Sequence, residues 1–189
     1  MTLRSRSGIV ALLVCAAARA QSRPIDTPSS KLTVHVFKAG MFSTFGHDHV
    51  IDAPIASGTA DTTALRVELR VRSAALRVTD PKNSESDRAG TQKTMTGPDV
   101  LDVGRFPEIV FQSTAAEPKG PAAWRVQGNL TIHGETKPVT VDVTEKDGHY
   151  LGSAVVKQTD FGIKPVRVAG GTVRVKDEVR IEFDVRLAQ

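Results

Sequence analysis

The chain has 189 residues, a formal net charge of +4 and a single cysteine, Cys15, near its start. Three of the 25 basic residues and none of the 21 acidic ones lie in residues 1–20, so the rest of the chain carries a charge of only +1. Scattered, nearly balanced charge gives no basic patch for phosphates, which excludes nucleic acid as the expected partner.

The first twenty residues have the pattern of a secretory signal peptide. Two arginines precede an apolar run, Ile9–Ala18, and small residues mark a cleavage site after Ala20. The run is too short to cross a bilayer, which takes about 20 apolar residues, and no transmembrane segment is predicted elsewhere. We therefore expect a periplasmic or secreted protein whose mature form has no thiol. The alternative is a lipoprotein signal ending at Cys15, which would carry the lipid.

Residues 21–30 are predicted to be a polar leader, and residues 31–187 a single domain. In the domain, apolar and polar residues alternate, as in strands with one dry and one wet face. The expected strands lie at 31–37, 46–60, 65–72, 107–116, 122–133, 139–144, 148–160, 171–177 and 179–187. A one-sided sheet loses its exposed edges best by closing on itself, so we predict an all-β fold, an antiparallel eight-stranded barrel.

Residues 80–103 interrupt the alternation with a polar stretch. A helix is predicted near residues 85–96, followed by a short turn that begins at Pro98. This short helical insert is expected to act as a lid or plug at one mouth of the barrel.

The predicted barrel interior is apolar and rich in valine. An eight-stranded barrel either fills with side chains or holds one small ligand, and modest side chains leave room for a long hydrocarbon. A filled, ligand-free core is the alternative that composition leaves open. The residues expected to line the interior are Val34, Val36, Val67, Leu69, Ile109, Phe111, Trp124, Val126, Val141, Ile181 and Phe183.

The segment His47-Asp48-His49 is a candidate polar site. On a strand the two imidazoles share one face, where they can contact a ligand head group or form hydrogen bonds at the barrel rim. They can also supply half of a metal site, with a third ligand from His35 or His133. The rim role is the interpretation we favour, and no metal or other cofactor is expected.

An anionic head group would need cations near the mouth of the barrel. The candidates are Arg88 and Lys93 in the helical insert, and Lys164 and Arg167 further along the chain. No nucleophile elbow, phosphate-binding loop or zinc-protease helix occurs in the sequence, so we do not expect an enzyme.

Three motifs together resemble the YceI-like family over roughly residues 30–187. They are Leu101–Val103 with Phe106–Phe111, Gly128–Gly134 with Thr136–Val139, and Asp160–Gly162. The resemblance implies a lipocalin-like barrel that binds amphiphiles, polyisoprenoids in particular, and that can form a homodimer. The predicted function is thus non-catalytic enclosure of a lipid-like molecule. The two rivals are a metal-dependent periplasmic enzyme using His47 and His49, and a ligand-free structural barrel.

Overall fold

The computed structural model of the chain describes residues 22–39, 48–168 and 173–189. The predicted signal segment, Cys15 and His47 therefore lie outside the described residues. The strands are β1 (Ser22–Pro24), β2 (Lys31–Ala39), β3 (His49–Asp52), β4 (Ile55–Asp61), β5 (Arg66–Arg72), β6 (Arg77–Val78), β7 (Glu108–Gly120), β8 (Ala123–Ile132), β9 (Glu135–Lys146), β10 (His149–Lys157), β11 (Arg167–Val168) and β12 (Val173–Arg186). The helices are α1 (Glu85–Thr96) and the 3₁₀ turns η1 (Thr27–Ser29), η3 (Ser73–Ala75) and η4 (Gln158–Phe161).

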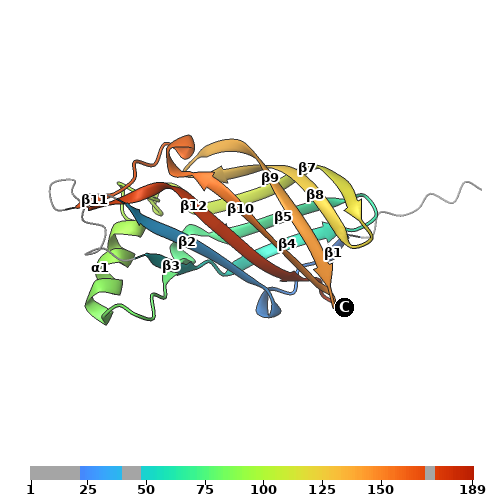
Figure 1. The fold of residues 1–189 in the computed structure, drawn as a ribbon, viewed down its shortest axis with the longest axis horizontal. Coiled ribbons are helices and arrows are strands. Elements are labelled where there is room, and N and C mark those ends of the chain that lie inside the picture. The colour runs from blue at the N-terminus through green and yellow to red at the C-terminus, as the bar shows by residue number, and fades with distance from the viewer. Residues whose placement is uncertain (1–21, 40–47, 169–172) are drawn as a thin grey trace, which may run out of the picture.

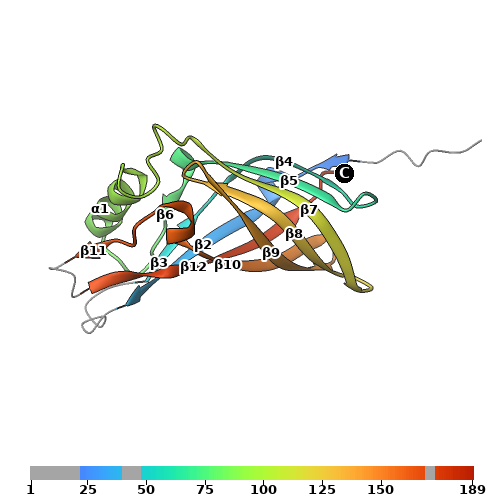
Figure 2. The same cartoon turned by 90° about the horizontal axis from the view of Figure 1, so that it is seen from above.

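All the strands belong to one antiparallel sheet that curls into a half-barrel (Figure 1). Eleven of them follow the path β1-β4-β5-β7-β8-β9-β10-β12-β2-β3-β6, and β11 pairs with β12 beside that path. The view from above shows the strands wrapping around a common axis, with α1 and β11 at one end (Figure 2). The prediction of an all-β antiparallel fold with one helix is confirmed.

The predicted number of eight strands is wrong, because one predicted strand is divided and three short strands were not predicted. The described part of the strand predicted at 46–60 forms β3 and β4, since Pro54 between them has no N–H for the ladder. The strands β1, β6 and β11 lie outside every predicted strand. Conversely, the strands predicted at 171–177 and 179–187 correspond to one strand, β12, with a register shift between Val175 and Val179.

Residues 22–30, which we predicted to be a polar leader, are paired with the sheet. β1 pairs with β4, and the Ile25 N–H donates to the Gly58 carbonyl over 2.9 Å. Ile25 is 6% exposed, and its side chain occupies the space beside Gly58. A single isoleucine in a polar decapeptide was too weak a signal for a strand.

Helix α1 begins and ends where the sequence predicts, at Glu85 and Thr96. Ser84 caps its first turn by accepting a hydrogen bond from the Asp87 N–H over 3.1 Å. The side-chain amide of Gln92 ties the helix to β6, accepting from Val78 N and donating to the Leu76 carbonyl, each over 2.9 Å. Figure 1 shows α1 at one end of the half-barrel. Met95 is its buried residue, so the helix contributes little to the core.

Strand glycines allow two phenylalanine rings to lie close to the wall of the sheet. A Cβ on Gly128 would lie 2.5 Å from the Phe111 ring, and one on Gly152 would overlap the Phe183 ring. Each ring therefore covers a glycine of a neighbouring strand. This arrangement keeps the bulk of both rings out of the centre of the half-barrel.

Candidate ligand-binding cavity

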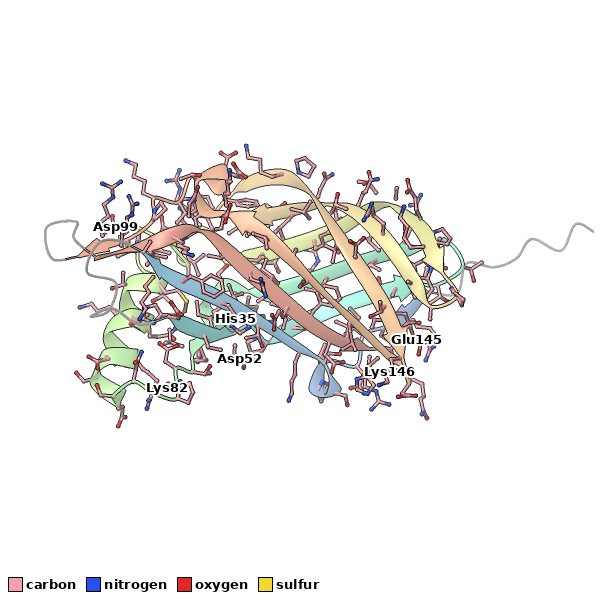
Figure 3. All side chains as sticks on the ribbon, viewed as in Figure 1. His35, Asp52, Lys82, Asp99, Glu145 and Lys146 are labelled. Atoms are coloured by element: carbon pink, nitrogen blue, oxygen red, sulfur yellow. The ribbon has the colours of Figure 1, made fainter. Side chains whose placement is uncertain are left out.

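The curled sheet encloses a cavity of about 880 Å³. Small-molecule sites are concave, mostly apolar and about 300–1,000 Å³ in volume, so this cavity is at the upper end of that range. Its lining extends from Ser86 and Asp87 in α1 to Thr62 and Leu65 between β4 and β5. Figure 3 labels Lys82 at the α1 end of the molecule and Lys146 toward the opposite end. An interior of this size argues against the alternative of a solid, ligand-free barrel.

The walls of the cavity are aliphatic because the strands alternate strictly. Every second residue of β5, such as Val67 and Leu69, borders the cavity, while Arg70 points outward to ion pairs with Glu68 and Glu108. The cavity is bordered by all eleven residues that the sequence placed in the interior: Val34, Val36, Val67, Leu69, Ile109, Phe111, Trp124, Val126, Val141, Ile181 and Phe183.

Polar residues gather at the two ends of the cavity. At the end covered by α1 the lining includes Lys38, His49, Asn83, Ser86, Asp87, Thr91, Thr94, Gln158 and Arg174. At the other end the cavity is bordered by Asp61, the last residue of β4, and by Thr62 in the turn that follows. The carboxylate of Asp61 is occupied by the backbone N–H groups of Thr63 and Ala64, at 2.9 and 2.7 Å. The α1 end is thus the end with the larger number of polar side chains.

His49 is held in place by a buried carboxylate at the α1 end. Its Nδ1–H donates to Asp80 Oδ2 over 2.6 Å, and Asp80 is 2% exposed. The same carboxylate accepts hydrogen bonds from the Val50 N–H and from Asn83 Nδ2. An ionised carboxylate accepts only, so the proton of the pair lies on Nδ1 and the ring is fixed in one orientation. Nε2 is then the nitrogen left for the cavity that His49 borders.

Of the other predicted head-group residues, none in the described chain borders the cavity. The Arg88 guanidinium donates to the carbonyls of Asn83 and Asp80 and so braces the loop before α1. Lys93, Lys164 and Arg167 are exposed and lie outside the cavity lining.

Sequence reasoning missed two cations that do border the cavity, Lys38 and Arg174. Lys38 continues the period-two series of inward residues on β2 that contains Val34 and Val36, so the alternation itself was the available signal. Arg174 lies on β12 before its register shift, where that alternation does not hold.

Of the histidines considered as metal ligands, the three that the structure describes, His35, His49 and His133, are not brought together. His35 lies on the outer face of β2, where Nε2 pairs with Glu182 at 3.2 Å, whereas His49 faces inward. The His133 ring packs on Phe106, with centroids 4.4 Å apart, and its Nδ1 lies 3.3 Å from the Phe161 carbonyl. Across residues 22–39, 48–168 and 173–189, no group of three or more His, Cys, Asp or Glu residues has the geometry to hold a metal.

The turn η4 forms part of the cavity wall and is anchored by Asp177. The backbone N–H and the hydroxyl of Thr159 donate to the two Asp177 oxygens, at 2.9 and 2.7 Å. The hydrogen bond from the Thr159 hydroxyl lowers the pKa of Asp177, because it stabilises the ionised form. These bonds position Gln158 and Phe161, which both border the cavity, and Phe161 is 1% exposed.

The fold and the cavity define a class of protein: a curled antiparallel sheet around an apolar cavity with a polar end. The chain matches the YceI-like domain over residues 24–187, and it belongs to the YceI-like family. The resemblance inferred from the three sequence motifs is therefore confirmed.

Relatives of known sequence span most of the chain. It is 30% identical over 173 residues to a UPF0312 protein of Shewanella sp. (strain W3-18-1), covering 82% of this chain and 83% of the relative. It is 27% identical over 192 residues to a UPF0312 protein of Vibrio parahaemolyticus, covering 92% of each. Neither of these two names denotes an enzymatic reaction.

Solved structures show the same fold. BcnA of Burkholderia cenocepacia superposes with a TM-score of 0.63 at 21% identity, covering 87% of this chain and 99% of that one. The YceI protein of Campylobacter jejuni superposes with a TM-score of 0.50 at 15% identity, covering 74% and 81%. Among the described residues, no helix has the length and apolar character needed to cross a membrane.

Proposed function

We propose that the protein binds a lipid-like amphiphile, of the polyisoprenoid type, with its tail inside the cavity, and that it does so without catalysing a reaction. The observation that carries the proposal is the 880 Å³ cavity with aliphatic walls along its length and polar residues at its α1 end. An apolar tail and a polar head are the chemistry that matches such a lining. Family membership supports a binding role in general.

The length of the tail decides the affinity. Each buried methylene contributes about 0.8 kcal/mol, so ten contribute about 8 kcal/mol. Association costs roughly 4–15 kcal/mol in lost translational, rotational and internal freedom, so a ten-carbon tail binds weakly. Twenty carbons contribute about 16 kcal/mol by the same rule, and only tails of this length exceed the upper end of the cost.

The predicted signal peptide supports a place for this function outside the cytoplasm. A long apolar tail does not cross an aqueous compartment unaided, because its transfer to water is unfavourable by the same 0.8 kcal/mol per methylene. A soluble protein that encloses the tail removes that barrier. We therefore place the binding function in the periplasm or outside the cell.

The proposal is tested by titrating the mature protein with the C20 isoprenol geranylgeraniol. Trp124 borders the cavity, with its ring centroid 6.2 Å from that of Tyr150, so a bound tail changes its fluorescence. We expect a saturable change in Trp124 emission, and native mass spectra with one ligand per chain. A protein that stays ligand-free in the mass spectrum and shows unchanged emission contradicts the proposal.

A further inference from the structure

We infer that the α1 end of the cavity is a site for an anionic head group, a phosphate or a carboxylate. In the bound state His49 has taken up a proton from solvent, so that Nε2–H donates to the anion while Nδ1–H donates to Asp80. The inference rests on the proposed function, since it assigns the head group of the same ligand. It starts from the His49–Asp80 pair.

The Asp80 carboxylate fixes His49 rather than merely neutralising it. Three donors, His49 Nδ1 and the Val50 N–H on β3 and Asn83 Nδ2 in the loop before α1, converge on the two oxygens of a side chain that is 3% exposed. A carboxylate that is fixed by three hydrogen bonds holds the ring against rotation. The ring edge that carries Nε2 is thereby kept at the cavity, and no partner for Nε2 occurs within the described residues.

The charges bordering this end favour an anion. Arg174 borders the cavity together with His49, and the acid among the lining residues here is Asp87. Asp87 accepts a hydrogen bond from the Ser84 hydroxyl over 2.7 Å and lies in the first turn of α1, where it stabilises the helix. The carboxylate of Asp80 is already paired behind His49. An oxyanion that enters from the cavity therefore meets more positive than negative charge.

A second pair of the same kind provides a matched control. His149 Nδ1 lies 2.7 Å from Asp184 Oδ1, which repeats the geometry of the His49–Asp80 pair, but His149 does not border the cavity. The same substitution is made at each histidine in a separate variant. Comparing the two variants distinguishes the loss of a histidine–aspartate pair from the loss of Nε2 at the cavity.

The experiment compares three probes with the same C20 tail, geranylgeranyl phosphate, geranylgeranoic acid and geranylgeraniol, each kept below its aggregation concentration and measured by calorimetry. His49→Asn retains an N–H for Asp80 but has no atom at the position of Nε2. We expect the wild type to bind at least one anion about tenfold or more tightly than the alcohol, since hydrogen bonds to charged groups are the stronger ones. In His49→Asn the anion should bind no better than the alcohol, and His149→Asn should behave like the wild type.

Failure of the inference differs from failure of the proposed function. If the wild type binds all three probes equally, or if His49→Asn keeps its preference for the anion, the head-group site is wrong while the cavity still binds tails. If the wild type binds none of the probes, the proposed function itself fails. Should His49→Asn unfold, the exposed Arg174 gives the second test: Arg174→Gln should weaken the anion and leave the alcohol unchanged, and an unchanged preference overturns the assignment.

Discussion

Two adjacent residues of β10 allow the inside of the half-barrel to be tested against the outside. Ala154 borders the cavity and pairs with Ile181 across the sheet, whereas Val155, the next residue, points outward and is 59% exposed. Ala154→Phe places a ring in the space that the tail would occupy. Val155→Phe places the same ring in solvent, on the same strand.

The expected effect on binding follows from the space that the ring takes. If the ring displaces about four methylenes of the tail, binding weakens by about 3 kcal/mol, more than a hundredfold in the dissociation constant. The ring enters an open cavity and not packed side chains, so the free energy of unfolding should not fall. Val155→Phe should change that free energy by no more than about 0.5 kcal/mol and leave binding unchanged.

The dissociation constant of geranylgeraniol is measured for both variants by titration calorimetry. Urea unfolding then gives the free energy of unfolding of each variant as the check on the fold. If Ala154→Phe binds as tightly as Val155→Phe, the tail does not occupy the cavity. If Ala154→Phe is destabilised by several kcal/mol, the interior around residue 154 is packed, and the cavity described here is wrong.

Two further changes test the support of the cavity wall at η4. Phe161→Ala should lower the free energy of unfolding by about 3 kcal/mol, the low end for a buried phenylalanine, because the lost ring enlarges an existing cavity. A urea midpoint equal to that of the wild type would refute the role of Phe161 in the core. Asp177→Asn should lower the free energy of unfolding by about 1 kcal/mol at pH 7, because it weakens the hydrogen bonds from Thr159. Since the pKa of Asp177 is lowered below its ordinary 3.8, its stabilisation is present above that pH and is lost as the pH falls through the folded value. The difference between Asp177→Asn and the wild type should therefore shrink at pH 3, and a difference that is independent of pH would contradict this assignment.

The alternation of apolar and polar residues along the strands made the residues of the interior predictable. Whether a residue faces in or out depends only on its parity along a regular strand, so residues such as Leu69 and Phe111 could be placed from the sequence. The turn at His133-Gly134 was predictable too, because Gly134 takes the positive φ of 78° expected there.

The ends of the cavity were less predictable because they depend on contacts between distant segments. The partner of His49 is Asp80, 31 residues away, and nothing in the local sequence of either residue indicates the pair. Arg88 lies in the predicted helix, but its side chain turns to loop carbonyls that only the folded chain brings near. Arg174 lies before the register shift of β12, where the alternation does not hold, so it could not be assigned to the cavity in advance.

The glycines of the wall have a consequence for how the capacity of this protein can be changed. Phe111 and Phe183 lie flat because Gly128 and Gly152 present only a hydrogen atom beneath them. An alanine at either position would push the aromatic ring away from the wall and toward the centre of the cavity. The width of the cavity can therefore be reduced by adding a single methyl group at one of these glycines, without any change to the strands that form the wall.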